Sequence, residues 1–505
     1  MRLPLLFAVI LCSAYQASYG LTSGDYTYTI NASGVTITSY NGSGGFVAIP
    51  QLINGQQVKI IGDSAFSNYT TLTGVTIPSG VVSIGSAAFY NCRITNVDIP
   101  EGVTSIGSSA FSNCTSLAGI SIPSSVASIG SSAFFNSGLV TATVPSAVTS
   151  LQDSTFNNCT SLVSVTLPTG LLRIGDYAFS NCSVLSSASI PSSVISMGVN
   201  AFYGSKISRI TIPAGITTIS SSAFSNCTSL TEVNLPYGLK SIESSAFYST
   251  KVSTIVIPST VTNIGDSAFS NCTSLVDVTI PYGVTNIGNY AFYNSRIPSV
   301  SVPGSVTYLG ESAFSNCSQL ATASIANGVT SIGRYAFYGS NLNSITLPTT
   351  ITSIGDYAFN SCINLTSVYF QGNAPTVGTE IFAQANNVHV YYNSTSSGWS
   401  SSFGGRIASV LRVDSDNDGY DDLSEAEFGT NPLNSLSIPQ TSSSLLQLTE
   451  FRFPTIPNSS YSVQSSTDLL NWTTIQSAVQ GDGGIKTYQE YVGQNQRKFF
   501  RSIRN

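Results

Sequence analysis

The sequence predicts a mainly β solenoid of about fourteen coils, with β caps at both ends and a small C-terminal β domain. Three observations favour this fold. A phenylalanine returns every 22 or 23 residues between Phe66 and Phe359. Nearly every copy has the same order of apolar strand, proline, second apolar run and turn. Hydrophobic residues make up 42% of the chain and charged residues only 8%. A fixed period in this range is typical of a solenoid, whose repeats contact mainly their neighbours.

The repeats extend over residues 61–365. The phenylalanines that mark them are Phe66, Phe89, Phe111, Phe134, Phe156, Phe179, Phe202, Phe224, Phe247, Phe269, Phe292, Phe314, Phe337 and Phe359.

Residues 1–20 have the pattern of a secretory signal peptide. Arg2 supplies a positive start, residues 3–12 are apolar, and small residues lead to a plausible cleavage site at Gly20. Leu11 is large for the residue that precedes a lipid-modified cysteine, which disfavours lipidation at Cys12. We therefore expect a protein that is secreted, extracellular or bound at the cell surface, without a transmembrane segment in the mature chain.

Residues 21–60 predict an N-terminal β cap. Tyr26, Tyr28 and Ile30 alternate with threonines, as in a half-buried strand, and glycine-containing turns follow. A solenoid needs such a cap because its first coil otherwise exposes an apolar face and a strand edge.

Within a coil, the spacing of the apolar residues predicts which side chains point into the core. Ile120 and Ile122 point inward from a strand that Pro123 ends, since proline has no N–H to donate. Val126 and Ile129 supply the second inward run. Each coil then buries about six apolar side chains, each worth roughly 1.5–3 kcal/mol.

A glycine follows this second run in most coils and suggests a tight bend or a positive φ. These glycines are Gly62, Gly85, Gly107, Gly130, Gly175, Gly265, Gly288, Gly333 and Gly355.

The full pattern is Leu-x-x-Ile-x-Ile-Pro-x-x-Val-x-x-Ile-Gly-x-x-Ala-Phe-x-x-Cys, as in residues 94–114 and 252–272. It resembles the BspA-like leucine-rich repeat family of secreted and surface proteins. The resemblance implies a curved leucine-rich repeat solenoid. It also implies adhesion or macromolecular binding rather than catalysis, and it names no ligand.

Two kinds of coil mostly alternate and give a superrepeat of 45 residues, with two long coils adjacent at Phe156 and Phe179. Six residues lead from Phe111 to Leu117 in a long coil, and five lead from Phe292 to Ile297 in a short one.

In the short coils a tyrosine usually follows the phenylalanine. These tyrosines are Tyr90, Tyr203, Tyr248, Tyr293 and Tyr338. A row of exposed rings can bind sugars or a protein, and we name it as a candidate ligand-binding row; the alternative is that the rings cover the coil edge.

Eight cysteines each lie three residues after a repeat phenylalanine. They are Cys92, Cys114, Cys159, Cys182, Cys227, Cys272, Cys317 and Cys362. Only Cys92–Cys114 and Cys159–Cys182 are in neighbouring coils and within disulfide reach, because two coils span about 10 Å. Buried thiols are the favoured interpretation.

Asn113-Cys-Thr115 matches a glycosylation sequon, but we expect that asparagine recurs because it suits the turn.

Outward strand positions are mostly small and polar. Examples are Thr73, Thr76, Ala118, Ser121, Thr166, Ser208, Thr211, Thr279 and Thr346. Charges such as Arg209 and Glu232 are scattered. The net charge is -6 and no basic run stands out, so we expect no nucleic-acid partner.

Residues 366–412 predict a degenerate repeat and a closing cap, built on strand-like segments such as 388–392. The single histidine of the chain, His389, lies here.

Residues 436–505 predict a small β domain, similar to C-terminal modules of secreted bacterial proteins. Anchoring, sorting and ligand contact are all open as its role.

Residues 413–435 contain the sharpest chemical motif, a loop typical of Ca²⁺ binding and a linker. The expected ligands, at loop positions 1, 3, 5, 7, 9 and 12, are Asp414, Asp416, Asp418, the Tyr420 carbonyl, Asp422 and Glu425. Gly419 supplies the turn, while Asp421 stands where an EF-hand has an apolar residue. The stretch more closely resembles a bacterial thrombospondin type 3 repeat. The alternative is a solvated acidic linker.

Taken together, these features predict a secreted or cell-surface adhesin that presents a solenoid face to an extracellular protein or polysaccharide, with a calcium-stabilised joint to the C-terminal domain. The alternative is a structural scaffold of an envelope or matrix. Catalysis is disfavoured because the chain has one histidine and its acids concentrate in the calcium-like loop.

We expect the purified chain to bind one Ca²⁺, because the five expected ligand carboxylates, so close in sequence, repel one another unless a cation lies among them. Titration calorimetry with millimolar Ca²⁺ measures this binding. The variant Asp416→Asn should weaken it, and the absence of heat from the unmodified chain would show that the loop is only an acidic linker.

Overall fold

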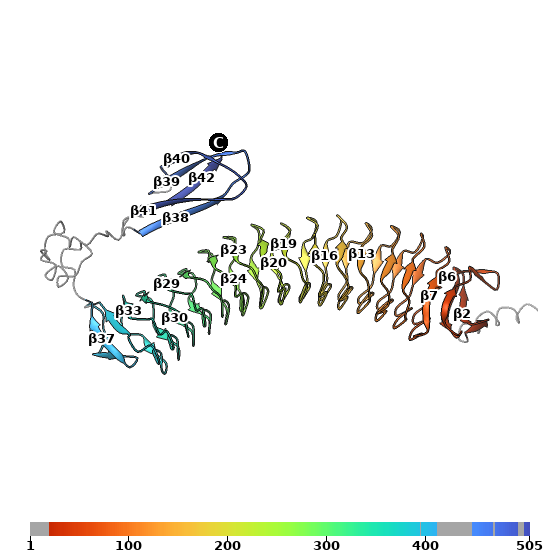
Figure 1. Cartoon of the computed structure of the whole chain (residues 1–505), viewed down its shortest axis with the longest axis horizontal. Coiled ribbons are helices and arrows are strands. Elements are labelled where there is room, and N and C mark those ends of the chain that lie inside the picture. Colours follow the sequence, from red (N-terminus) through yellow and green to blue (C-terminus); the bar gives the residue numbers. More distant parts are fainter. Residues whose placement is uncertain (1–19, 394, 412–446, 468–469, 493–498, 505) are drawn as a thin grey trace, which may run out of the picture. The chain divides into compact units, whose positions relative to one another are not determined.

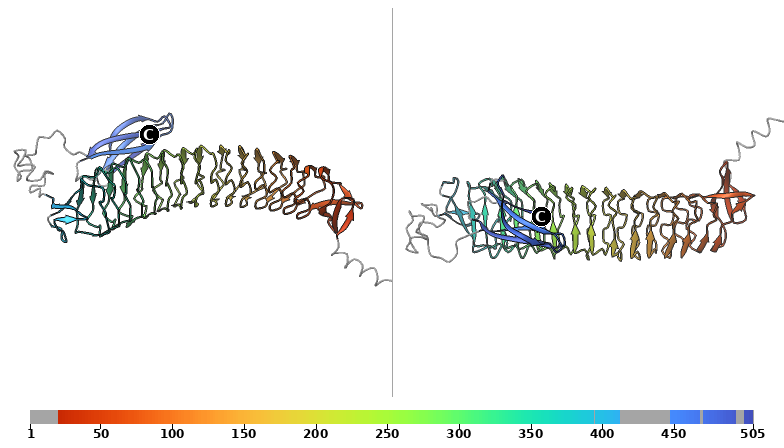
Figure 2. Two further views of the ribbon diagram at one scale, coloured as in Figure 1. Left: turned by 60° about the horizontal axis from the view of Figure 1, so that its bottom comes forward. Right: turned by 90° about the horizontal axis from the view of Figure 1, so that it is seen from above.

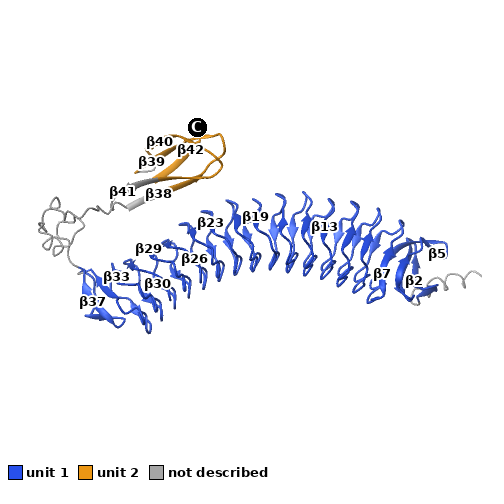
Figure 3. Ribbon diagram, viewed as in Figure 1, with its two compact units in different colours: residues 1–411 blue, residues 412–505 orange. Residues whose placement is uncertain are grey.

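The computed structural model describes residues 20–393, 395–411, 447–467, 470–492 and 499–504 (Figure 1). These residues form strands and turns, with no helix among them. The chain divides into two compact units, residues 1–411 and residues 412–505 (Figure 3). Unit 1 by itself is a gently curved stack of coils, and both further views show the coils side by side along its length (Figure 2). The prediction of a mainly β solenoid is confirmed.

Unit 1 begins with an antiparallel meander of β1 (Leu21–Ser23), β2 (Tyr26–Asn31) and β3 (Gly34–Tyr40). The meander covers the first coil, because β3 then pairs in parallel with β6 (Gln56–Ile61). The short strand β5 (Leu52–Ile53) pairs antiparallel with β6.

Each coil contributes one strand to a first row, which usually ends at a proline. The first-row strands are β4 (Gly45–Ala48), β7 (Leu72–Thr76), β9 (Asn96–Asp98), β11 (Gly119–Ser121), β13 (Thr141–Thr143), β15 (Ser164–Thr166), β17 (Ser187–Ala188), β19 (Arg209–Thr211), β21 (Glu232–Asn234), β23 (Thr254–Val256), β25 (Asp277–Thr279), β27 (Ser299–Val302), β29 (Thr322–Ile325), β31 (Ser344–Leu347), β33 (Ser367–Phe370), β35 (His389–Tyr392) and β37 (Arg406–Val410).

A second row of shorter strands follows β3 and β6. These strands are β8 (Ser83–Ile84), β10 (Ser105–Ile106), β12 (Ser128–Ile129), β14 (Ser150–Leu151), β16 (Arg173–Ile174), β18 (Ser196–Met197), β20 (Thr218–Ile219), β22 (Ser241–Ile242), β24 (Asn263–Ile264), β26 (Asn286–Ile287), β28 (Tyr308–Leu309), β30 (Ser331–Ile332), β32 (Ser353–Ile354) and β34 (Thr376–Val377). At the C-terminal end of unit 1, β36 (Ser402–Phe403) pairs antiparallel with β37.

The first-row ladder is interrupted in step with the two kinds of coil. The strand that follows a five-residue turn starts a new ladder at β9, β13, β19, β23 and β27, and it pairs with the next strand. The strand β31 also follows a short turn but stays paired with β29, so the ladder is continuous from β27 to β37. In the structure, the 45-residue superrepeat therefore corresponds to a break in the first-row ladder after most of the five-residue turns.

The repeat phenylalanines form one buried stack. Neighbouring rings from Phe66 to Phe359 lie 5.1–5.8 Å apart between centroids and are fully buried. The stack continues beyond the fourteen marked repeats, because Tyr40 stacks on Phe66 at 5.1 Å and Phe382 stacks on Phe359 at 5.7 Å. The solenoid therefore has about 16 turns rather than about fourteen. The sequence pattern hides the two end coils because a tyrosine replaces one phenylalanine and the flanking residues of Phe382 differ.

Backbone hydrogen bonds also join the coils at the turn around each phenylalanine. Three N–H groups, two residues apart, donate to carbonyls of the next coil. In one coil these bonds are Ser109 N to Ser131 O at 2.8 Å, Phe111 N to Ala133 O at 2.8 Å and Asn113 N to Phe135 O at 2.7 Å. We call this repeated arrangement the turn ladder.

The turn ladder requires two left-handed residues in nearly every coil, such as Ser109 (φ 55) and Asn113 (φ 59). Asparagine tolerates this conformation better than most residues, which explains why it recurs two residues after the phenylalanine. Of the two alternatives given for the repeat glycines, a tight bend or a positive φ, the positive φ is wrong. A Cβ on Gly130 would lie 2.4 Å from Ser108 N, so glycine is needed there for the close approach of the neighbouring coil.

The described residues of unit 2 form five antiparallel strands in two sheets. The first sheet pairs β38 (Gln447–Pro454) with β41 (Ile485–Val492), and the second has the order β40 (Thr473–Gln480), β39 (Ser460–Ser466) and β42 (Phe499–Arg504). Phe453 from the first sheet and Tyr461 and Val463 from the second form a common core.

Removing one ring from the middle of the stack should destabilise unit 1 strongly. Phe224 lies between Phe202 at 5.6 Å and Phe247 at 5.5 Å and is fully buried. We expect Phe224→Ala to cost about 3–5 kcal/mol, because the cavity cannot close between fixed coils. Urea unfolding measures the loss, with the exposed Thr279→Ala as control. A cost for Phe224→Ala as small as that of the control would contradict the role of the stack.

Candidate functional site

The outward side of the first row is a long face of small polar residues. The outward residues predicted from the sequence, among them Thr76, Ser121, Thr211 and Thr346, are all exposed, as expected. Their side chains contribute nothing to the core, whereas the inward residues between them, such as Ile210 (3% exposed), are buried. This face is therefore free to carry function without affecting the interior of the coil.

The composition of the outward face changes at its C-terminal end, where aromatic rings replace threonine and serine. Tyr391 stacks on Tyr369 with ring centroids 5.1 Å apart, and His389 stacks on Tyr391 at 4.6 Å. The His389 Nε2 atom is 2.8 Å from the Ser409 Oγ atom, at hydrogen-bond distance. The sequence placed these residues in the closing cap without a role; the signal was the appearance of tyrosine at outward positions that elsewhere hold serine or threonine.

A hollow of about 480 Å³ lies beside this stack. We call it the terminal hollow, and its lining residues are Thr346, Thr349, Tyr369, Phe370, Gln371, Asn393 and Leu411. None of these side chains is charged. Asn393 Nδ2 donates to the backbone carbonyl of Gln371 at 3.1 Å, which holds the Asn393 amide at the rim.

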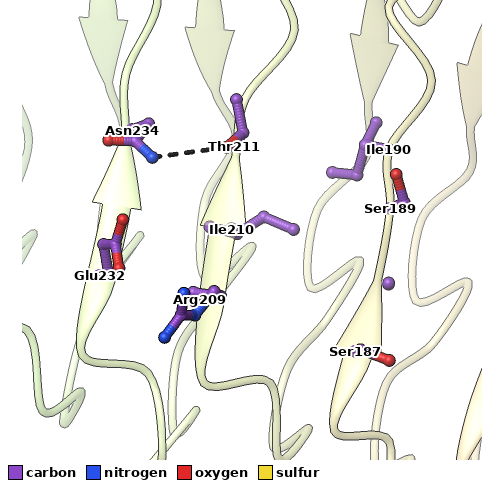
Figure 4. Close-up of a pocket in the computed structure, with 9 residues that line it drawn as sticks. Ser187, Ser189, Ile190, Arg209, Ile210, Thr211, Glu232 and Asn234 are labelled. Carbon is purple, nitrogen blue, oxygen red and sulfur yellow. Dashed lines mark hydrogen bonds between the residues drawn. The ribbon is translucent and has the colours of Figure 1, made fainter. Parts of the chain in front are cut away.

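A second hollow, of about 450 Å³, lies near the middle of the face, and we call it the central hollow (Figure 4). Its lining residues are Ser187, Ala188, Ser189, Ile190, Arg209, Ile210, Thr211, Glu232 and Asn234. Both strand rows are interrupted here, because β17 does not pair with β19 and β18 does not pair with β20. Arg209 and Glu232 are register partners on β19 and β21, and Asn234 Nδ2 donates to Thr211 Oγ1 at 3.4 Å.

The predicted tyrosine row is present at the turn edge, and its rings are only partly exposed. Tyr90, Tyr203, Tyr248, Tyr293 and Tyr338 all belong to this class. In long coils the same position holds a small residue, and the serines there, such as Ser112 and Ser225, are 3% exposed. Large rings that flank small buried residues are the arrangement expected when the rings cover the coil edge. The ligand-binding role of the row stays a prediction.

Further aromatic residues on the same edge were not anticipated. Tyr335 stacks on Tyr357 with centroids 4.9 Å apart, and the Arg334 guanidinium lies 4.8 Å from the Tyr335 ring centroid. Tyr335 also contacts Tyr338 of the row edge-on, at 5.6 Å. Tyr335 and Tyr357 occupy the first left-handed position of their coils, where residue type varies, so no regular pattern marks them.

The eight predicted cysteines are buried and free, including both pairs within disulfide reach. Each thiol donates to the carbonyl of a phenylalanine in the preceding coil, as Cys114 Sγ does to Phe89 O at 3.0 Å. In the short coils other than that of Cys92, a serine or threonine takes the cysteine position, and Ser137 Oγ lies 3.3 Å from Cys159 Sγ. Burial raises the pKa of the Cys114 thiol from 9.0 to about 12. These thiols are structural.

Two predicted features lie outside the described residues. They are the signal peptide and the calcium loop, with its expected ligands Asp414, Asp416, Asp418, Tyr420, Asp422 and Glu425. Within the described ranges, no three acidic, cysteine or histidine side chains gather as a metal site.

Stacked parallel coils, with an apolar strand and a buried phenylalanine in each repeat and a proline after most of the strands, define a leucine-rich repeat solenoid. The sequence matches the family described as BspA type leucine-rich repeat region, over residues 47–163, 149–276, 241–347 and 285–406. The chain belongs to this family. Proteins with leucine-rich repeats are generally binding or structural proteins rather than enzymes.

Several solved structures are similar to this chain. A leucine-rich repeat protein from Bacteroides ovatus is 25% identical with a TM-score of 0.58, covering 78% of this chain and 100% of its own. A leucine rich cell surface protein from Faecalibacterium prausnitzii is 32% identical with a TM-score of 0.48, covering 71% and 96%. The pneumococcal vaccine antigen PcpA is 17% identical with a TM-score of 0.40, covering 79% and 100%. No curated protein matches the chain.

We expect the eight buried cysteines to resist a thiol reagent such as Ellman's reagent at pH 8, because they are inaccessible and their raised pKa keeps them protonated. In denaturant without reductant, all eight should react. The count is read from absorbance. A shortfall of two would reveal a Cys92–Cys114 or Cys159–Cys182 disulfide, and rapid reaction of the native protein would contradict the burial.

Proposed function

We propose that this protein is a non-enzymatic binding protein of the cell exterior, an adhesin that presents the outward face of its first strand row to an extracellular protein or polysaccharide. The observation that carries this proposal is the face itself. It is a long array of exposed small polar side chains, fixed by a core to which they contribute nothing. A surface held rigid before binding loses little conformational entropy when a ligand docks.

Two features support a location outside the cytoplasm. Residues 1–20 have the pattern of a secretory signal, and the similar protein from Faecalibacterium prausnitzii is described as a cell surface protein. As a separate finding that bears on no location, the described part of the chain has no helix long and apolar enough to cross a membrane.

A binding role fits the chemistry of the chain better than catalysis does. The single histidine is engaged in the ring stack and with Ser409, so it is held as a structural group. The ion pairs Arg173–Asp153 and Arg334–Asp356 are both partly exposed and lie in different parts of the solenoid. Their charged groups therefore do not form one acid–base site.

We further propose that Ca²⁺ binds the loop at residues 414–425 and orders the joint between the two units. The support is the spacing of its carboxylates, which supplies the six or more oxygens that this cation requires. The joint would then limit how far the C-terminal domain moves away from the solenoid.

The direct test of the proposed function is to screen the purified full chain against arrays of glycans and extracellular matrix proteins. Saturable binding to a member of either array supports the adhesin. Failure to bind on both arrays would overturn it and favour the alternative, a structural scaffold without a specific ligand.

The contribution of the tyrosine row can be measured on any ligand found in this way. If the row binds ligand, the double variant Tyr248→Ala, Tyr293→Ala should lose binding by about tenfold or more, because exposed rings contribute contact area with little entropy cost. The matched control is Tyr248→Phe, Tyr293→Phe, which keeps the rings. Unchanged binding in the alanine variant would show that the row only covers the coil edge.

A further inference from the structure

We propose that the terminal hollow is a subsite for a neutral sugar ring, which stacks on Tyr369 within a bound polysaccharide. This inference rests on the proposed function and deepens it, because it chooses the class of ligand and assigns the residues that contact it.

Tyr369 is half-buried and lines the hollow. Tyr391, in the next coil, stacks on one face of the Tyr369 ring, with ring planes 16° apart. In the preceding coil the register partner of Tyr369 is Thr346, a much smaller residue. Because Thr346 is too small to cover the neighbouring ring of Tyr369, we infer that the other face of this ring forms a wall of the hollow. Pyranose rings bind to flat aromatic faces of this kind through their C–H groups.

The ring that forms this wall is braced from behind. His389 packs on Tyr391 with ring planes 19° apart, and His389 is in turn at hydrogen-bond distance from Ser409 on β37. Three side chains from β33 and β35 thus form one stack whose far end is tied to the next strand. A ring positioned in this way loses little rotamer entropy when a ligand stacks on it, which favours binding.

The polar groups of the hollow are suited to sugar hydroxyls. Asn393 is fixed by its bond to the Gln371 carbonyl, and its amide oxygen faces no competing donor among the described residues. The Gln371 side-chain amide likewise has no hydrogen-bond partner in the described part of the chain and is exposed. Thr346 and Thr349 add hydroxyl groups to the lining, and the Thr349 hydroxyl, which donates to Asn327 Oδ1 at 3.1 Å, can still accept from a ligand. Amides and hydroxyls both donate and accept, as a saccharide requires.

The absence of charge in the lining decides between ligand classes. The central hollow carries Arg209 and Glu232, whereas the lining of the terminal hollow is neutral. A charged peptide or an acidic sugar would be desolvated there without a counter-charge, which costs free energy. The volume of about 480 Å³ is within the range of ligand sites and is large for one sugar ring, so the neighbouring rings of a chain can enter as well.

The test is titration calorimetry of the full chain with hexasaccharides of β-1,4-linked glucose, mannose and N-acetylglucosamine, and with a galacturonic acid hexamer as the acidic comparison. We expect at least one neutral hexamer to bind and the acidic one not to. Tyr369→Ala should weaken that binding by about tenfold or more, whereas Tyr369→Phe should stay within about twofold. Tyr237→Ala is the matched control, because Tyr237 is a 77% exposed tyrosine on another turn.

Thermal unfolding confirms that each variant keeps its fold. The inference is overturned if no neutral hexamer binds, or if Tyr369→Ala binds the hexamer as tightly as the unmodified chain. A matrix protein that binds the chain while every hexamer fails would leave the proposed adhesin function intact and remove only the sugar subsite. Failure on both arrays and in the titrations would remove both.

Discussion

The turn ladder is the constraint on which the rest of unit 1 depends. Three backbone donors per coil, the N–H groups of Ser109, Phe111 and Asn113 in one of them, point at the next coil, and a left-handed residue stands at each end of this turn, here Ser109 and Asn113. A non-glycine residue in the left-handed region costs free energy, roughly 1 kcal/mol or more. The cost is met because each such residue donates a hydrogen bond that would otherwise be lost in a buried turn. Where the strand ladders are interrupted, as between β17 and β19, the turn ladder continues.

The regular interior follows from this ladder. Once neighbouring turns are in register, the phenylalanine rings meet face to face at 5.1–5.8 Å, and each cysteine thiol reaches a carbonyl one coil away. The close approach also explains the repeat glycines, since a Cβ on Gly130 would collide with backbone of the previous coil. The cysteine position accepts serine or threonine in short coils because it needs a small group that donates a hydrogen bond, as Ser137 and Cys159 show.

The exterior is under a different constraint, because outward side chains of the first row take no part in the core. Their residue type can change from coil to coil without altering the packing of the core, and most are serine or threonine. Tyr369, Tyr391 and His389 depart from this composition in two adjacent coils. In such a solenoid we therefore expect function where the residue type at the outward positions of the first row changes, rather than where the repeat is most regular. The tyrosine row belongs to the regular part of the repeat, which fits the role of covering the coil edge.

The sequence by itself determined the period, the inward residues, the two kinds of coil and the exposed polar face, because each of these depends on spacing along one coil. The tertiary structure decided what depends on contacts between coils. It extended the ring stack to Tyr40 and Phe382, and it moved the left-handed backbone from the glycines to residues such as Ser109. It also brought together Tyr369 and Tyr391, which are 22 residues apart in sequence. Such contacts are set by the register between coils, and no local pattern of residues encodes which ring faces are left uncovered.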